Sequence, residues 1–345
     1  MTRGDVMQLV TRVFVCAAVL SVGAAEGANR TVCASGCQYS GVQAAIDAAV
    51  PGDTILLRAG QTFTGNYVLR NKNTTSTQFI TIRSDAADSN FPAAGVRLIP
   101  EGRAGWNTRR SVLARLIGAG GTAKSTAIFR AAAGAHHYRI QFLEIDGVAN
   151  VGYETLVELG TGVGQTSLSQ VPHSLVIDRV WLHGHSIKGM KRGIYLNSAS
   201  TDILNSYFED FWSLADSQAI SSTNGPGPFR IINNHLEAAG ENIQFGGDDP
   251  KILNLVPSDI QIRGNYMSKD LKWRNPVLTT PSKPTAAVAS AAGSLAAGTH
   301  YFKVAAVMAT GGAYVYSAGS AETAISVSAG RSVSLSWSAV AGADR

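Results

Sequence analysis

Apolar positions recur along the middle of this chain in short segments that resemble one another. Each segment begins with an isoleucine and places another large apolar residue five positions later, around a partly polar centre. The five segments are Ile140–Ile145, Ile177–Leu182, Ile203–Phe208, Ile231–Leu236 and Ile262–Met267. Their first residues are thus 37, 26, 28 and 31 positions apart. Repetition at this period predicts a solenoid in which each repeat is one turn with loops of variable length.

A second series of strand signals lies between these segments. Val157, Ile194, Ile220 and Ile243 each begin a short apolar stretch, and the last three are 26 and 23 residues apart. Asn, Gly and Ser separate the two series, and the spacing has no helical period. Two strand signals per repeat predict a coil of parallel β-strands. We therefore expect an all-β chain that folds as a right-handed parallel β-helix.

An amphipathic helix is predicted ahead of the first strand. Residues 40–43 have the form of a capping box. Apolar residues then follow at i, i+3, i+4 and i+7, namely Val42, Ala45, Ile46 and Ala49. Pro51, Gly52 and Asp53 end the helix, and Thr54–Leu57 is the expected first strand. A helix here would cover the open edge and the apolar lumen of the first coil.

These residues carry a resemblance to a known superfamily. The stretch Tyr39–Leu57 resembles the N-terminal motif of the pectin lyase-like right-handed β-helices, and the resemblance extends from about residue 31 to 275. Asn233–Asp248 is similar to a segment of secreted bacterial members. The superfamily contains lyases, hydrolases, esterases, epimerases and phage tailspikes. The resemblance therefore implies a fold, and the function has to come from the site.

The N-terminus has the features of a secretory signal peptide. Arg3 and Arg12 precede the apolar run Val13–Val22, and small residues follow it. This pattern predicts a signal peptide over residues 1–25, cleaved near Ala24 or Ala25, and the run is too short to span a membrane. Cys33 and Cys37 are the cysteines that remain after cleavage, and outside the cell we expect them to form one local disulfide.

The composition of the chain changes after about residue 275. Prolines are followed by Ala, Gly, Ser and Thr with alternating apolar residues at Tyr301–Val307, Ala324–Val327 and Val333–Trp337. We expect the β-helix to occupy residues 26–275 and a partial β-sandwich module, similar to fibronectin type III domains, to occupy residues 276–345. Such a module usually continues into a further strand, so we expect the chain to be a fragment.

Overall composition excludes several classes of protein. Of 345 residues, 45% are hydrophobic and 15% are charged, so the chain can bury a large core and is not disordered. The net charge of +5 comes without a Lys/Arg run, which argues against nucleic acid as a partner. We expect a soluble monomer without membrane contact after signal cleavage. A mildly basic groove could also attract an acidic polymer.

Outward-facing residues of the second series predict a groove. Because strand residues alternate, the residue after each inward apolar residue points outward, and equivalent residues of successive coils stand about 4.8 Å apart. These residues are Glu158, Tyr195, Ser221 and Gln244. The rim position two residues before each inward isoleucine is held by Arg192, Gln218 and Glu241. A linear groove of this kind suits an extracellular polysaccharide.

The residues near this groove suggest lysis of an acidic polysaccharide. Elimination from a uronate needs a cation to neutralise the carboxylate and a base to remove the C5 proton. Glu241, Asp248 and Asp249 offer the oxygen ligands that Ca²⁺ prefers. Arg192 and Lys191, together with Lys188, His183, His185 and His235, could supply positive charge or a base. Arg192, Glu241 and Lys191 are our candidate catalytic residues.

Each candidate also has a purely structural explanation. Asp248 and Asp249 follow two glycines in a turn, and Glu241 could satisfy a loop. The Lys188, Lys191 and Arg192 cluster could be solvated surface. The four asparagines that recur around the repeat could bond neighbouring turns instead of a ligand: Asn205, Asn233, Asn234 and Asn265.

Three functions therefore remain open, with the lyase first. The motif order of polygalacturonases is absent, since Gly184-His185-Ser186 precedes Asp248-Asp249 and no Asn-Thr-Asp occurs. A different carboxylate pair could still support a glycoside hydrolase. The third alternative is a non-catalytic surface protein that only binds glycan, with the C-terminal module as a spacer. Tyr195 is the one aromatic that the pattern places on the groove, which favours chemistry over simple binding.

Overall fold

The computed structural model describes residues 27–119, 127–147, 154–186, 189–213, 215–270, 273, 278–310 and 313–344. The predicted signal peptide and Lys188 lie outside the described residues. Among the described residues, no helix is long and apolar enough to cross a membrane.

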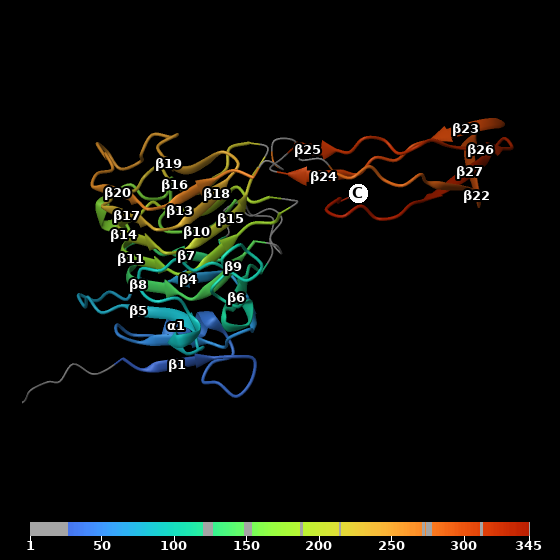
Figure 1. Ribbon diagram of the computed structural model, residues 1–345. Coiled ribbons are helices and arrows are strands. Elements are labelled where there is room, and N and C mark those ends of the chain that lie inside the picture. The colour runs from blue at the N-terminus through green and yellow to red at the C-terminus, as the bar shows by residue number, and fades with distance from the viewer. Residues whose placement is uncertain are drawn as a thin grey trace, which may run out of the picture.

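Three parallel sheets wind around a common axis and form a solenoid (Figure 1). Sheet 1 has the order β1 (Asn29–Val32), β2 (Thr54–Leu57), β5 (Ile80–Ser84), β8 (His136–Gln141), β11 (His173–Asp178), β14 (Ala199–Leu204), β17 (Phe229–Ile232) and β20 (Ile260–Arg263). Sheet 2 contains β3 (Thr62–Thr64), β6 (Ala114–Ile117), β9 (Leu143–Asp146), β12 (Trp181–His183), β15 (Tyr207–Phe211), β18 (His235–Ala238) and β21 (Tyr266–Ser268). Sheet 3 contains β4 (Tyr67–Leu69), β7 (Phe129–Ala131), β10 (Thr155–Glu158), β13 (Arg192–Tyr195), β16 (Gln218–Ser222) and β19 (Glu241–Phe245). The predicted parallel β-helix is therefore confirmed.

The strand register agrees with the sequence repeat. Ile140, Ile177, Ile203, Ile231 and Ile262 are successive partners along sheet 1. The residues five positions later are partners along sheet 2, and the second series, Val157, Ile194, Ile220 and Ile243, along sheet 3. Most of these side chains form one buried cluster inside the coils. Each buried large apolar side chain contributes about 1.5–3 kcal/mol relative to its exposed state.

Polar ladders hold the corner between sheets 1 and 2. Asn205 and Asn233 stand at this corner with positive φ values of 51° and 57°. The Asn233 amide donates to Asn205 Oδ1 at 2.9 Å, and the Asn205 amide donates to Asp178 Oδ1 at 2.9 Å. Asn234 and Asn265 form a second ladder beside the first. These four asparagines therefore have the inter-turn role that the repeat suggested.

Helix α1 (Val42–Ala48) packs against the first coils, as expected for a cap (Figure 1). Val42 and Ile46 are buried in the core cluster. The expected capping box is wrong, because Gly41 is the N-cap and no side chain caps the helix. Gln43 instead pairs with the backbone of Val68, donating to its carbonyl at 3.2 Å and accepting from its N–H at 2.7 Å. Its side chain joins the helix to β4.

The first coil begins earlier than the sequence suggested. Strand β1 precedes α1 and pairs in parallel with β2, so Thr54–Leu57 is the second strand and not the first. The buried Asp53 carboxylate accepts from the Ala28 N–H at 2.8 Å and from the Val50 N–H at 2.9 Å. A disulfide joins Cys33 and Cys37, with a Cα–Cα distance of 5.5 Å, at the end of β1.

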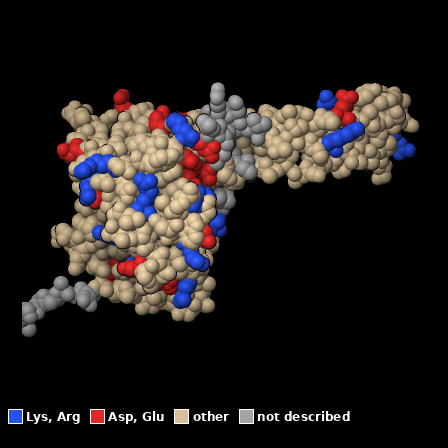
Figure 2. All heavy atoms as spheres, in the orientation of Figure 1, with Lys and Arg blue, Asp and Glu red and all other residues tan. Residues whose placement is uncertain are grey.

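A separate β module follows the solenoid and projects away from it (Figure 1). It consists of three two-stranded antiparallel sheets: β22 (Thr285–Leu295) with β27 (Arg331–Ser336), β23 (Gly298–Phe302) with β26 (Thr323–Val327), and β24 (Val307–Thr310) with β25 (Ala313–Tyr316). Leu278, Ala306 and Met308 bury apolar surface against Trp212 of the solenoid. Charged side chains of both signs are interspersed on the viewed face of the solenoid, and the module carries few (Figure 2).

Candidate active site

A cavity of about 410 Å³ opens on the outer face of sheet 3. Its lining residues lie in or just before β7 and β10, in β13 and in the loop after β10: Ala127, Arg130, Glu154, Thr155, Glu158, Thr161, Gly162, Val163, Gly164, Arg192 and Tyr195. We call this cavity the sheet 3 pocket. Three residues that the sequence placed on one groove, Glu158, Arg192 and Tyr195, lie together in it.

The floor of the pocket is a row of register partners. Arg130, Glu158 and Tyr195 are successive partners on β7, β10 and β13, so neighbouring residues of the row stand about 4.8 Å apart. The Arg130 Nε donates to Glu158 Oε2 at 2.9 Å. Burial raises the pKa of the Glu158 carboxyl above its ordinary value, and the charge and hydrogen bond of Arg130 only partly oppose this. Glu158 therefore places a carboxyl of raised pKa at the pocket.

Arg192 and Tyr195 form the other side of the pocket. The Arg192 guanidinium lies 5.2 Å from the centre of the Tyr195 ring, and its Nε donates to Gln218 Oε1 at 3.1 Å. The Tyr195 hydroxyl lies 2.6 Å from the hydroxyl of Thr223. Asp216 lies 3.3 Å from the Arg192 guanidinium. These contacts hold a cation and a phenol in fixed positions at the pocket.

The outer wall is a loop that is anchored from inside the molecule. The buried Gln165 side chain donates to the carbonyls of Asn197 and Asn224 at 3.0 and 2.9 Å. Asn224 donates in return to the Gln165 carbonyl at 2.7 Å. These bonds tie residues 161–164 to the next two coils, so the wall is part of the solenoid and not a free lid.

Arg130 and the loop wall were missed by the sequence reasoning. Phe129 aligns with Val157 along sheet 3, 28 residues earlier, so extending the second series by one coil would have placed Arg130 beside Glu158. The loop wall had no comparable signal, because Gln165 belongs to no repeat position.

Gln218 and Ser221 are in the predicted register, but the expectation that they face solvent is wrong. Their exposed fractions are 0% and 1%. Gln218 is enclosed by its bonds to Arg192 and Glu241. Tyr195, the register partner of Ser221 on β13, has its hydroxyl 2.6 Å from that of Thr223. Gln244 is half-buried, as are Glu158 and Tyr195, and of these three residues Glu158 and Tyr195 line the cavity.

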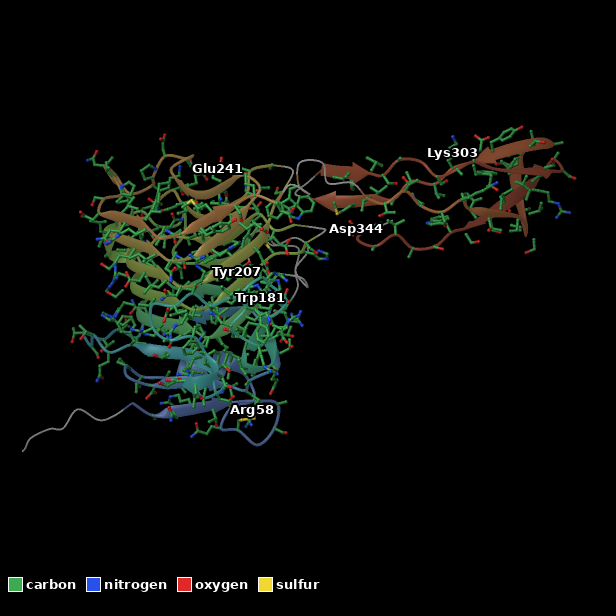
Figure 3. The ribbon with its side chains drawn as sticks, in the orientation of Figure 1. Arg58, Trp181, Tyr207, Glu241, Lys303 and Asp344 are labelled. Atoms are coloured by element: carbon green, nitrogen blue, oxygen red, sulfur yellow. A yellow bond between two sulfur atoms is a disulfide. The ribbon has the colours of Figure 1, made fainter. Side chains whose placement is uncertain are left out.

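Lys191 and Glu241 do not line the sheet 3 pocket. The Lys191 ammonium lies 2.8 Å from Asp216. Glu241 is exposed and accepts a hydrogen bond from Gln218 at 3.0 Å. Figure 3 shows Glu241 toward the last coils of the solenoid. Of the three candidate catalytic residues, only Arg192 lies at the pocket.

The expected calcium ligands do not converge. Glu241 begins β19, whereas Asp248 and Asp249 are exposed in the turn after it. Asp248 lies 3.8 Å from the Lys251 ammonium. Among the residues that the structure describes, these three carboxylates do not form a group with all ligand atoms within 4.8 Å of one another. They do not fit a calcium ion.

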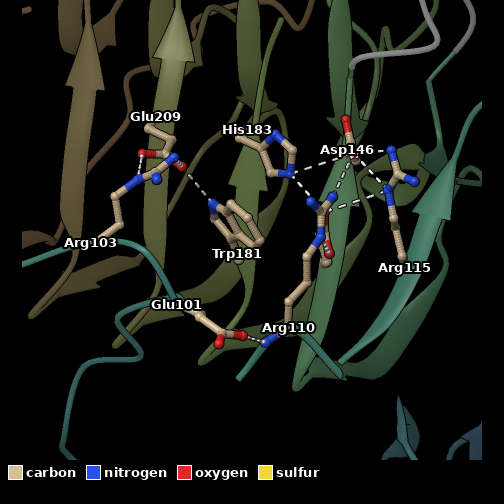
Figure 4. Close-up of polar contacts among 9 residues, drawn as sticks. Glu101, Arg103, Arg110, Arg115, Asp146, Trp181, His183 and Glu209 are labelled. Atoms are coloured by element: carbon tan, nitrogen blue, oxygen red, sulfur yellow. Dashed lines mark hydrogen bonds and ion pairs between the residues drawn. The ribbon is translucent and has the colours of Figure 1, made fainter. Parts of the chain in front are cut away.

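Such a group does occur on the outer face of sheet 2, where Glu144, Asp146 and His183 have ligand atoms within 4.8 Å of one another. Figure 4 shows Asp146 and His183 of this group beside Arg110 and Arg115. Arg110 forms an ion pair with Glu144, and Arg115 Nε donates to Asp146 at 2.7 Å. Burial raises the pKa of Glu144, but the bonds and charges of His183 and Arg110 outweigh it and hold the pKa below its ordinary value. The two carboxylates are already neutralised by arginines, and Ca²⁺ prefers oxygen ligands to imidazole, so calcium does not fit this group well.

The same network clamps the long segment before β6 onto sheet 2. Arg103 makes two bonds of 2.7 Å to Glu209, and the Trp181 indole donates to Glu209 at 2.9 Å (Figure 4). His183 is buried within this network and bonds Glu144 at 3.0 Å. His183 thus contacts the same carboxylate that pairs with Arg110 of this segment.

No protein-family model matches the chain, and no curated protein matches it. A solved structure of an alginate lyase from Paenibacillus sp. str. FPU-7 is similar over 70% of this chain and 74% of that chain, with 15% sequence identity and a TM-score of 0.37. The pectin lyase-like and fibronectin type III-like resemblances stay predictions.

Proposed function

We propose that this chain is a polysaccharide lyase that cleaves a uronate-containing polymer at the sheet 3 pocket. The observation that carries the proposal is the set of groups around one cavity. Two guanidiniums, Arg130 and Arg192, face it together with Glu158, a carboxyl whose pKa is raised by burial. A volume of about 410 Å³ lies within the usual range of small-ligand sites.

The groups divide the work of a β-elimination between them. Arg192 binds the uronate carboxylate and makes the proton at C5 more acidic, because it stabilises the negative charge that develops there. Glu158 takes that proton, the bond between C4 and the glycosidic oxygen breaks, and a C4–C5 double bond forms. The leaving oxygen gains a proton from the Tyr195 hydroxyl, and the proton that Glu158 took from C5 returns to Tyr195 through water, so that both residues regain their starting states. Arg130 holds Glu158 in place through its 2.9 Å bond.

In this proposal the positive charge that neutralises the uronate carboxylate of the substrate comes from the protein itself. Arg192 performs the task that Ca²⁺ was expected to perform. We therefore expect activity to persist after treatment with EDTA, and loss of activity that added Ca²⁺ restores would contradict the assignment to Arg192.

A glycoside hydrolase is a second candidate, because Glu154 and Glu158 line the same pocket. Two carboxyl groups, one with a raised pKa, are the usual set for glycoside hydrolysis. The product distinguishes the reactions, since a lyase leaves an unsaturated uronate that absorbs in the ultraviolet, and a hydrolase leaves reducing ends without that absorbance.

The cellular setting is also a proposal. Export through the N-terminal signal peptide would place the protein outside the cell, where acidic polysaccharides occur. We propose that the protein acts there as a monomer, on a polysaccharide and not on nucleic acid.

The decisive experiment compares Glu158→Gln with Glu241→Gln on alginate, pectate and chondroitin. Both variants remove one carboxylate from the outer face of sheet 3, but only Glu158 lines the pocket. We expect ultraviolet-absorbing product from at least one polymer, a loss of about 10²–10⁴ in kcat for Glu158→Gln, and little change for Glu241→Gln. For the wild type, kcat/KM should rise with pH through the raised pKa of Glu158, because a base acts only when deprotonated.

Absence of ultraviolet-absorbing product from all three polymers would refute the lyase on these substrate classes. Reducing ends without absorbance would move the protein to the hydrolases. Glycan binding without either product would support the third alternative, a non-catalytic protein that only binds glycan.

A further inference from the structure

Two histidines line a second cavity, of about 380 Å³, which shares no lining residue with the sheet 3 pocket. His136 of β8 and His173 of β11 are register partners, and their rings are stacked with centres 4.9 Å apart. The other lining residues lie in the segment after β4, in the turn before β8 and in the loop after β10. Since these segments connect sheet 3 to sheet 1, we call this cavity the corner cavity.

Each of the two imidazoles has one nitrogen in contact with a neighbour inside the protein. His136 Nδ1 lies 2.6 Å from His137 Nδ1, and His173 Nδ1 lies 3.2 Å from the Ser174 hydroxyl. Among the described residues, neither ring has a hydrogen-bond partner at its Nε2. Burial, followed by the nearby charge of His136, lowers the pKa of His173, which keeps this ring neutral. A neutral imidazole has one donor and one acceptor nitrogen, so each ring has a polar atom available to a ligand.

The rest of the lining is polar or apolar but uncharged. Asn73 and Thr75 are exposed in the segment after β4, and among the described residues their side chains have no hydrogen-bond partner. Leu168, which is 63% exposed, adds an apolar surface from the loop after β10. None of the described residues that line the cavity carries a formal charge.

The cations nearest to this lining in the sequence are bound elsewhere. Arg70 pairs with Asp47 of α1 at 2.7 Å, and the Lys72 ammonium donates to the carbonyls of Ile46 and Asp47 at 2.7 and 3.0 Å. Neither cation lines the corner cavity. A carboxylate or sulfate that entered would lose water without gaining a counter-charge, which is costly. The cavity therefore favours an uncharged polar ligand.

We propose that the corner cavity binds one uncharged sugar unit of a polysaccharide. Sugar hydroxyls donate and accept hydrogen bonds, as do the neutral imidazoles, amides and hydroxyls of this lining. The apolar C–H face of a sugar ring matches the Leu168 side chain. A volume of about 380 Å³ lies within the usual range of small-ligand sites.

One loop connects this cavity to the proposed active site. Residues 161–164 of the loop after β10 line the sheet 3 pocket, and Leu168 and Ser169 of the same loop line the corner cavity. A polymer held at one cavity therefore has the other close by. The choice of a sugar as the ligand rests on the proposed function, whereas the uncharged character of the ligand follows from the lining alone.

Saturation-transfer difference NMR of the full-length protein tests the site, with cellotriose, mannotriose and galactotriose as probes. We expect at least one probe to bind, with a Kd at least about fivefold higher in His173→Phe and in Thr75→Val, because each variant loses a hydrogen-bonding group. Phenylalanine keeps an aromatic ring at position 173, and valine keeps the shape of threonine.

Two matched controls should bind as the wild type does. Thr77→Val changes an exposed residue of the same segment that lies outside the lining. His300→Phe makes the same exchange in the C-terminal module. Because Thr75 is exposed, Thr75→Val also keeps the test valid if His173→Phe fails to fold.

Trigalacturonate, a charged trisaccharide, distinguishes this site from the sheet 3 pocket. We expect its binding to weaken in Arg192→Ala and to stay unchanged in His173→Phe, with the opposite pattern for the uncharged probe. Absence of binding by all three uncharged probes, or equal binding by the wild type and both cavity variants, would overturn the proposal. Loss of trigalacturonate binding in His173→Phe would also overturn it. If only trigalacturonate fails to bind the wild type, the corner cavity stands and the proposed lyase loses support.

Discussion

Two adjacent cations illustrate how a single position decides what a side chain can do. Lys191 and Arg192 share one acidic partner, Asp216, at 2.8 and 3.3 Å. Arg192 also lies over Tyr195 and lines the sheet 3 pocket, whereas Lys191 lies outside the lining. Proximity in sequence therefore gives these residues the same charge environment but different access to a ligand.

We predict different kinetic effects for these two residues. Arg192→Ala should lower kcat/KM for the polymer by about 10²–10³, because it removes a fixed cation at the developing negative charge. Lys191→Ala should change kcat/KM by less than about fivefold, since a partly exposed ion pair is worth about 0–1 kcal/mol. Steady-state kinetics of both variants checks this, and equal losses would show that the cluster acts only through general surface charge.

Among elements of structure, the corner between sheets 1 and 2 depends on buried amides. Asn234 donates to the Ile203 carbonyl at 2.9 Å and accepts from the Ser206 N–H at 2.8 Å. Its own N–H donates to Asn265 at 2.8 Å. The Asn234 side chain thus satisfies backbone groups of the preceding coil, and these hydrogen bonds link successive coils at the corner.

Asn234→Leu should destabilise the protein by about 2–5 kcal/mol, because it leaves a buried N–H and a buried C=O unpaired. Urea unfolding followed by circular dichroism measures this change. Asn90→Leu, at an exposed position in the 3₁₀ turn Asp88–Asn90, is the control and should cost less than about 1 kcal/mol. A similar small cost for Asn234→Leu would mean that the ladder adds little to stability.

For the whole molecule, stability depends on pH through buried titratable groups. His235 lies between Tyr207 and Tyr266, with ring centres 4.1 and 5.1 Å away. Burial, followed by the charge of Arg97, lowers the pKa of His235 from 6.5 to about 4. The folded protein therefore keeps this imidazole neutral under conditions in which the unfolded chain protonates it.

The sign of the pH effect follows from this difference. Between pH 6.5 and about 4 the unfolded chain binds the extra proton, so stability is complete above pH 6.5 and falls as the pH is lowered toward about 4. The loss is at most about 3 kcal/mol, because one pKa unit corresponds to about 1.4 kcal/mol.

Thermal unfolding across this pH range tests the prediction. His235→Phe keeps the stacking and should make the stability curve flatter between pH 4 and 6.5. An unchanged slope in this variant would show that other groups govern the acid sensitivity.

The sequence by itself determined the solenoid, the register of its coils and the cap. Inward apolar residues such as Ile194 and Ile220 repeat at each turn because the lumen needs one at each turn, and this requirement is visible in the chain. The repeat also placed Glu158 and Tyr195 side by side, and it assigned Asn234 to an inter-turn ladder.

Only the tertiary structure decided which outward positions are accessible and which charges meet. Gln218 is buried because its neighbours on adjacent coils bond over it, and the pocket wall exists because Gln165 is anchored to two later coils. Arg110 donates a hydrogen bond to Glu144 although 34 residues separate them in the sequence. Periodicity records the direction in which a side chain leaves its own strand, whereas accessibility and ion pairing depend on loops and side chains that are distant in sequence.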